Sequence, residues 1–144
     1  MARVGSLAAE KAAAILAGAL RQQIVTQNTA PELAERTAGA QYPAIYVYCG
    51  KVRNLLREKF RKFSGEAQMV VEVRVSQDRL EGLEALAQVS AEKVTDALDA
   101  QRGDWSDGMF FGGGYEIQYG PVKHGGQNFL QIAKVTFTVE VSIG

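Results

Sequence analysis

The side chains that most often carry catalysis or bind metals are scarce in this sequence. It contains one cysteine, Cys49, and one histidine, His124. Cys49 lies in an alternating apolar run, as small core residues do, and His124 precedes two glycines, which is typical of a surface turn. A lone cysteine forms neither an intrachain disulfide nor a cysteine metal cluster. We therefore expect no catalytic site, no metal and no cofactor, and a protein that acts by binding.

Two patterns look like known ligand sites but lack their defining residues. Gly112–Gly114 is a run of glycines, but no Lys-Ser or Lys-Thr pair follows it, so it does not match a phosphate-binding loop. Asp104, Asp107 and Glu116 supply carboxylates without the spacing of a calcium-binding loop. We interpret the glycines as a loop tip and the acids as solvated side chains.

The segment Lys51–Lys62 is the strongest candidate for binding. It contains six cations and one acid, Glu58, which gives a local net charge of +5. With Phe60 and Phe63 among them, these cations could bind phosphates and stack on bases, and the alternative is a solvated face. The apolar residues fit either a short helix or two strand ends flanking a long hairpin loop. The cations are Lys51, Arg53, Arg57, Lys59, Arg61 and Lys62.

A second candidate is the glycine-rich segment Gly103–Gly114, which shows neither helix nor strand periodicity. It carries four large apolar residues: Trp105, Met109, Phe110 and Phe111. Large apolar groups in a loop either pack on their own domain or contact a partner, and we favour a partner. Asp104 and Asp107 make the segment acidic, so it could attract the basic segment of a neighbouring copy.

Length and composition fit a single globular domain over residues 1–144. The hydrophobic fraction is 47% and the charged fraction 22%, which are ordinary values for a folded chain that can bury a sizeable core. Lys plus Arg equals Asp plus Glu at sixteen each, so net charge favours neither nucleic acid nor an anionic membrane. The apolar run Ala12–Leu20 is too short to span a membrane, and we expect an intracellular protein.

Apolar periodicity predicts two helices. The first covers Ser6–Gln27, with Ser6 as N-cap, and the second begins at a capping box of Asp78 and Glu81 and ends near Ala100. Their expected apolar faces are Ala9, Ala13, Leu16, Ala17, Leu20 and Ile24 in the first, and Leu80, Leu83, Ala87, Ala91, Val94 and Leu98 in the second.

Alternating residues predict four strands, at 45–49, 66–76, 115–120 and 129–142, with a polar connector over 28–41. In the last strand Val135, Phe137, Val139 and Val141 alternate with Lys134, Thr136, Thr138 and Glu140, which indicates one buried and one wet face. The expected fold is α+β. A four-stranded, mostly antiparallel sheet carries two helices on one face, in the order helix-strand-strand-helix-strand-strand.

The run YPAIYVYCG is followed by the basic segment, then by AQMVVEVRVSQDR leading into an acidic helix, and finally by FLQIAKVTFTVEVSIG. In element order, length and texture this resembles the tail-terminator, or tail-completion, proteins of long-tailed bacteriophages. The resemblance covers nearly the whole chain. It implies a virion protein, assembled in the host cytoplasm, with an α+β fold and no chemistry of its own.

The resemblance further implies a hexameric ring of identical copies. Such a ring caps the tail tube protein, joins the tail to the head connector or neck protein, and lets DNA pass through its lumen. The segments 51–62 and 103–114 would then contact neighbouring copies or the DNA channel. Two other functions stay open: a neck or head-completion protein, and a small nucleic-acid-binding regulator that uses segment 51–62.

Overall fold

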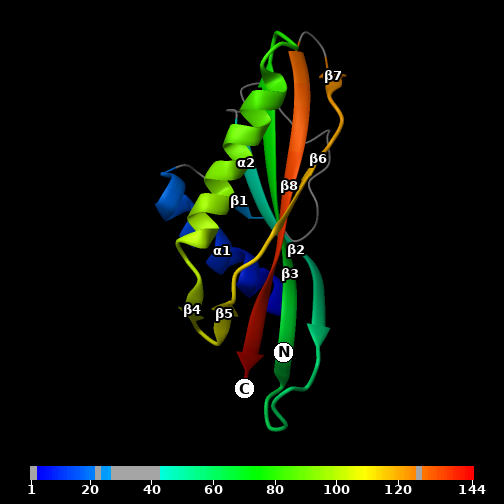
Figure 1. Ribbon diagram of the computed structural model, residues 1–144. Helices are drawn as coiled ribbons and strands as arrows, with labels where there is room; N and C mark the ends of the chain where they lie inside the picture. Colours follow the sequence, from blue (N-terminus) through cyan, green and yellow to red (C-terminus); the bar gives the residue numbers. More distant parts are fainter. Residues whose placement is uncertain (1–2, 22–23, 27–42, 126–127) are drawn as a thin grey trace.

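The chain folds as an α+β domain, as predicted (Figure 1). The computed structural model describes residues 3–21, 24–26, 43–125 and 128–144; the predicted connector 28–41 lies outside them. The elements are α1 (Val4–Leu20), β1 (Ile24–Thr26), β2 (Ala44–Asn54), β3 (Phe63–Gln77), α2 (Leu83–Asp99), β4 (Gly103–Ser106), β5 (Met109–Phe111), β6 (Glu116–Tyr119), β7 (Lys123–Gly125) and β8 (Asn128–Ile143).

The strands of the described ranges form one eight-stranded sheet, not the four-stranded one predicted. Its main path runs β1-β2-β3-β8-β5-β4, and β6 and β7 also pair with β8. Only the β1–β2 pairing is parallel within these ranges; all the others are antiparallel. The sequence predicted too few strands because β1, β4, β5 and β7 have only three or four residues each. Strands of this length are too short to show an alternation of apolar and polar residues.

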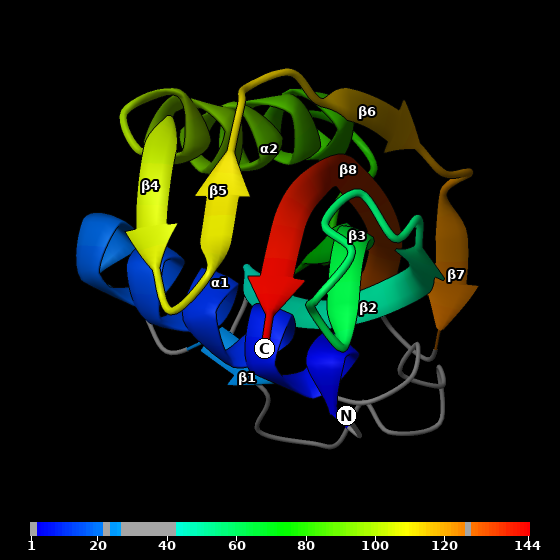
Figure 2. The same cartoon turned by 90° about the horizontal axis from the view of Figure 1, so that it is seen from below.

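The pair β3–β8 is the spine of the sheet, in unbroken register from Phe63↔Ile143 to Gln77↔Phe129. One face of each strand is buried: Met69, Val71, Val73 and Val75 on β3 and, as predicted, Val135, Phe137, Val139 and Val141 on β8. These residues form one core cluster with both helices, and Figure 2 shows α1 and α2 on the same side of the long strands.

Small residues let α1 lie close to the sheet. Its buried face consists mainly of alanine, with Ala8, Ala9 and Ala12 inaccessible to solvent, and a Cβ added at Gly5 would come within 3.1 Å of the Cys49 Cβ. The helix is shorter than predicted at its C-terminal end because Arg21 turns left-handed at φ 53°. Ile24 therefore starts β1 instead of continuing the helix. Ser6 is not the N-cap, since Arg3 holds that position.

The second helix begins later than predicted. Gly82, at φ 83°, is the N-cap of α2 and makes no side-chain capping bond, so Asp78 and Glu81 do not form a capping box. Gln77 holds the preceding turn instead: its Nε2 donates to the carbonyls of Arg79 and Glu81 at 2.8 and 2.7 Å. The predicted apolar face is confirmed from Leu83 to Leu98. Leu80, by contrast, lies outside the helix and is 55% exposed.

The outer face of the sheet is not uniformly wet. Glu72 and Arg74 of β3 are 3% and 1% exposed, and Arg74 Nη2 lies 2.9 Å from Glu72 Oε2. The Arg74 guanidinium also stacks over the Tyr46 ring, 4.6 Å from its centroid. Their burial shows that this part of the outer face is covered. No helix in the described part of the chain is long and apolar enough to cross a membrane.

Candidate interaction surface

The basic segment forms the end of the β2–β3 hairpin, which decides between the helix and hairpin alternatives in favour of the hairpin. Lys51 and Arg53 lie on β2, and the other four cations lie in the connecting loop. We call this loop, residues 55–62, the hairpin tip. Phe63 does not interleave with the cations, because it starts β3 and is 1% exposed in the core.

Asn54 closes the base of the hairpin tip. Its Oδ1 accepts hydrogen bonds from the backbone N–H groups of Leu56 and Ser64, each at 3.2 Å. Its Nδ2 donates to the Lys62 carbonyl at 3.1 Å. One side chain therefore ties both ends of the loop together, as Asn often does in turns.

Ser64 fixes the middle of the tip from the other strand. Its Oγ accepts from the Glu58 N–H at 2.8 Å, and its carbonyl accepts from the N–H groups of Leu55 and Arg57, each at 3.2 Å. Because these bonds come from within the chain, the path of the loop is set without any partner. A surface ordered in advance loses less entropy on binding.

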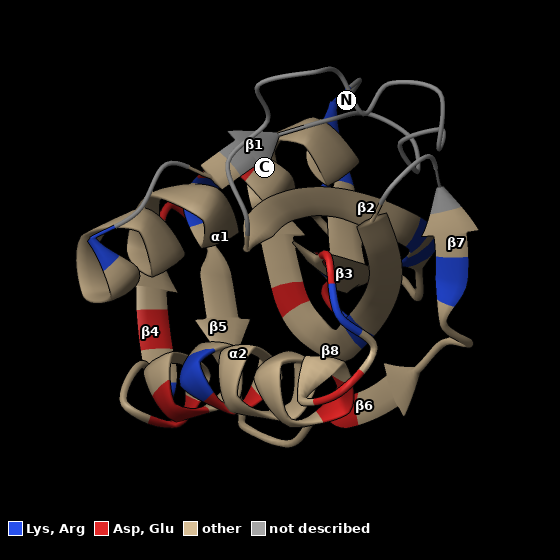
Figure 3. Cartoon of the chain, turned by 90° about the horizontal axis from the view of Figure 1, so that it is seen from above, with Lys and Arg blue, Asp and Glu red and all other residues tan. Residues whose placement is uncertain are grey.

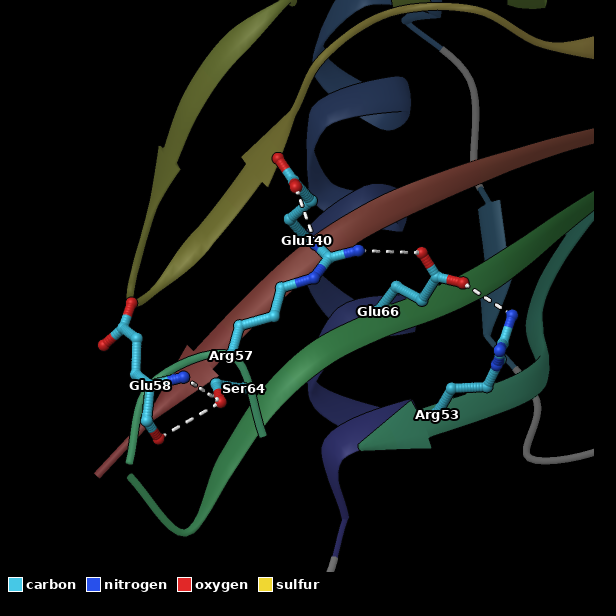
Figure 4. A network of polar contacts seen from close by, with 6 residues as sticks. All are labelled: Arg53, Arg57, Glu58, Ser64, Glu66 and Glu140. Carbon is cyan, nitrogen blue, oxygen red and sulfur yellow. Dashed lines mark hydrogen bonds and ion pairs between the residues drawn. The ribbon is translucent and has the colours of Figure 1, made fainter. Parts of the chain in front are cut away.

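Acids from the neighbouring strands offset part of the positive charge (Figure 4). Arg53 pairs with Glu66 of β3 at 3.4 Å. Arg57 bridges Glu66 at 3.8 Å and Glu140 of β8 at 2.9 Å. Arg61 pairs with Glu58 within the tip at 3.3 Å. Such exposed pairs each contribute at most about 1 kcal/mol, but they orient the arginines along the sheet.

Three cations of the segment have no such partner. Lys51, Lys59 and Lys62 form no ion pair with any residue in the described ranges. Counting Glu66 and Glu140 with Glu58, the six cations leave a net of +3 in place of the +5 of the linear sequence. The lysines are the charges left to meet an acidic or phosphate group from outside.

The hairpin tip also exposes large apolar side chains. Phe60 is 100% exposed, Leu56 62% and Leu55 37%. Leu56 is also held at φ 51°, a left-handed conformation that costs a non-glycine residue on the order of 1 kcal/mol or more. Apolar groups fixed in solvent at one end of a domain are typical of a surface that a partner covers.

The second candidate segment packs within its own chain, and there the prediction is wrong for Trp105, Met109 and Phe111. Residues 103–111 form the β4–β5 hairpin. Trp105 is 5% exposed and Phe111 is 0%. Both rings pack against Phe137, with centroids 6.2 and 5.4 Å away, and Trp105 Nε1 donates to the Gln101 carbonyl at 2.7 Å. They belong to the core, not to a surface that a partner could reach.

Phe110 is the aromatic residue of that hairpin that does face solvent, at 45% exposure. It lines a shallow groove with Arg57 and Glu58 of the tip and with Glu140, so the structure brings the two predicted segments side by side at this point. Asp107 is not free to attract a neighbour, because it pairs with Lys11 of α1 at 2.8 Å.

The reactive side chains do not gather into a site. Cys49 is half-buried, and burial raises the pKa of its thiol although a hydrogen bond with the Lys51 backbone acts the other way. His124 is exposed and lies against the Phe129 ring, 4.8 Å between centroids. Among the residues described, no three His, Cys, Asp or Glu side chains cluster closely enough to hold a metal ion.

Sequence reasoning missed the residues that shape the tip. Asn54 and Ser64 carry no pattern that separates them from other polar residues, and Glu140 lies on a strand remote from the loop in sequence. No protein-family model matches the chain, and no curated protein matches its sequence.

Proposed function

We propose that this chain is a structural protein of a phage virion, of the tail-terminator type, whose copies assemble into a ring. The ring would cap the tail tube and join the tail to the head connector, without catalysis. The observation that carries the proposal is the hairpin tip, whose backbone is held by the chain's own hydrogen bonds while its apolar side chains are exposed to solvent.

The energetics of the tip favour a contact surface. Burying one large apolar side chain such as Phe60 contributes roughly 1.5–3 kcal/mol, and the tip offers three such residues together. Because Asn54 and Ser64 already order the loop, most of that free energy is available to a partner. Aromatic residues with a polar surround are typical anchors of protein interfaces.

The order of the long elements also supports the proposal. The α1, β2, β3, α2 and β8 elements follow one another as the resemblance to tail terminators implies. A hexamer would present several copies of Lys51, Lys59 and Lys62, and such repeated, unpaired cations suit non-specific contact with DNA passing through a lumen.

The native mass of the purified chain tests the proposal. We expect a hexamer by light scattering or native mass spectrometry, formed alone or on mixing with a tail tube protein. Phe60→Ser should stay monomeric and folded, since Phe60 is wholly exposed. Tyr115→Ser is the matched control, an aromatic residue 40% exposed beside Asp99 at the end of α2. A wild-type chain that stays monomeric with tail tube and connector proteins present would refute the proposal.

A small nucleic-acid-binding regulator is the second candidate. It is favoured by Lys51, Lys59 and Lys62, which form no ion pair in the described ranges, and by the exposed Phe60. A monomer that shifts DNA in a gel at physiological salt would support it. In that case replacing Lys51, Lys59 and Lys62 by Gln should lower the slope of log affinity against log salt by up to about 3, at roughly 0.9 per phosphate contact. Tyr115→Ser should leave the shift unchanged.

A further inference from the structure

We propose that the hairpin tip of one copy docks in a groove at the start of α2 on the next copy. The inference rests on the proposed assembly into a ring and names the two surfaces that meet. The receiving surface, which we call the α2 groove, is lined by Leu80, Glu81, Gly82, Glu84, Ala85 and Val122.

The α2 groove combines apolar and acidic side chains. Leu80 is 55% exposed because the helix begins only after Gly82, and it lies with Val122 and Ala85. Glu81 and Glu84 are exposed and pair with no cation in the described part of the chain. Figure 3 shows further acidic positions along α2.

The hairpin tip has the complementary composition. Its apolar residues Leu55, Leu56 and Phe60 are exposed, and its lysines Lys59 and Lys62 form no ion pair with any residue that the structure describes. Both surfaces therefore expose apolar area. The tip carries cations and the groove carries carboxylates, so the two surfaces are also opposite in charge. Complementary charge fixes the register of such a contact and speeds its formation.

The two surfaces lie too far apart to meet within one molecule. β3 starts directly after the tip, at Phe63, and ends at Gln77 just before the groove. A strand of this length spans roughly 45 Å at about 3.3 Å per residue. Figure 1 shows the β2–β3 loop and the start of α2 at opposite ends of the molecule. A tip can thus reach only the groove of another copy.

One tip and one groove per copy make the contact heterologous, so each copy binds one neighbour on each side. Contacts of this kind close into a ring when the rotation between copies permits it. The charges of the tip and of the α2 groove also disfavour other binding partners. Two tips repel one another, and Glu81 and Glu84 repel the phosphates of a nucleic acid or an anionic membrane.

Charge exchange tests the pairing directly. A tip variant with Lys59→Glu and Lys62→Glu and a groove variant with Glu81→Lys and Glu84→Lys should each assemble with at least roughly tenfold weaker affinity. An equimolar mixture of the two should recover assembly, because acidic tips then meet basic grooves and basic tips meet acidic grooves. A chain carrying all four reversals should assemble alone. Circular dichroism confirms that each variant folds.

Glu92→Lys with Asp96→Lys is the matched control, since both acids are exposed on α2 but do not line the groove; it should assemble as the wild type does. If the wild type assembles and the groove variant assembles equally well, the pairing is wrong while the ring proposal stands. If both reversals prevent assembly and the mixture fails to recover, the pairing is also wrong. A wild type that never assembles refutes both.

Discussion

Arg74 is among the largest fully buried side chains of this protein and is charged. Its burial is compensated by the Glu72 carboxylate, which lies 2.9 Å away, and by the Tyr46 ring, which covers the guanidinium. Buried ion pairs add little net stability, but removing one partner leaves a charge that the interior cannot solvate. This arrangement makes a sharp prediction about single and double substitutions.

Glu72→Leu should lower the free energy of unfolding by about 3–5 kcal/mol, because it leaves a buried guanidinium without its carboxylate. The double variant Glu72→Leu with Arg74→Met should lose much less than the sum of the two single losses. Urea denaturation of the four proteins measures the coupling. Strictly additive losses would show that the two side chains do not act as a pair.

Cys49 gives a prediction about reactivity. Burial raises the pKa of its thiol, and only the thiolate attacks alkylating reagents. At a pH near ~7.5 the thiolate fraction is therefore smaller than in an unstructured peptide, and iodoacetamide should react several-fold more slowly. Raising the pH should increase the rate. Mass spectrometry follows the reaction, with the protein in guanidinium as control; equal rates in folded and unfolded protein would contradict this.

At the scale of elements, the β4–β5 hairpin shows where sequence patterns fail and what could replace them. Its two strands are too short for periodicity, so Gly103–Gly114 looks like a loop. The pair Asp107-Gly108, between Ser106 and Met109, is a hairpin signal, and a Cβ at Gly108 would collide with the Ser142 carbonyl oxygen. The long strands and the apolar face of α2 were predictable because their patterns repeat over several turns or residue pairs.

Burial of the β4–β5 hairpin predicts that the hairpin is needed for folding. Removing 105–111 should not leave a folded monomer, because Trp105 and Phe111 pack on Phe137. Trp105→Ala should lower the free energy of unfolding by about 3–5 kcal/mol. Phe110→Ala, at the exposed position beside them, should cost under about 0.5 kcal/mol. Thermal and urea unfolding compare the two, and a fully stable Trp105→Ala protein would contradict this packing.

The candidate surface was predictable only in part, and the missing part is tertiary. The sequence identifies the six cations of segment 51–62 but not which of them are neutralised. Glu66 lies on the second strand of the hairpin, and Glu140 becomes a neighbour of Arg57 only through the β3–β8 register. The start of α2 shows the same limit, because Gln77 displaces the expected capping box and thereby leaves Leu80 exposed.

At the scale of the whole molecule, zero net charge hides a separation of charge. The half up to Glu72 carries ten Lys and Arg against six Asp and Glu, and the half after it carries six against ten. The basic tip belongs to the first half and the acidic α2 to the second. In a head-to-tail assembly these ends face each other, so long-range attraction would speed the encounter while the apolar side chains hold the product together.

The proposed assembly should therefore respond differently to salt and to loss of Phe60. Raising NaCl from ~0.05 to ~0.5 M shortens the screening length severalfold, so the assembly rate should fall by roughly tenfold or more. The assembled fraction at equilibrium should change little, because the exposed Leu55, Leu56 and Phe60 are uncharged. Phe60→Ser should have the opposite effect. The initial rate should keep the salt dependence of the wild type, while the assembled fraction at equilibrium should fall strongly. Stopped-flow light scattering gives the rates and sedimentation the fractions. If salt dissolves the assembly as completely as Phe60→Ser does, charge and not apolar contact holds it together, and the hairpin tip has been assigned the wrong role.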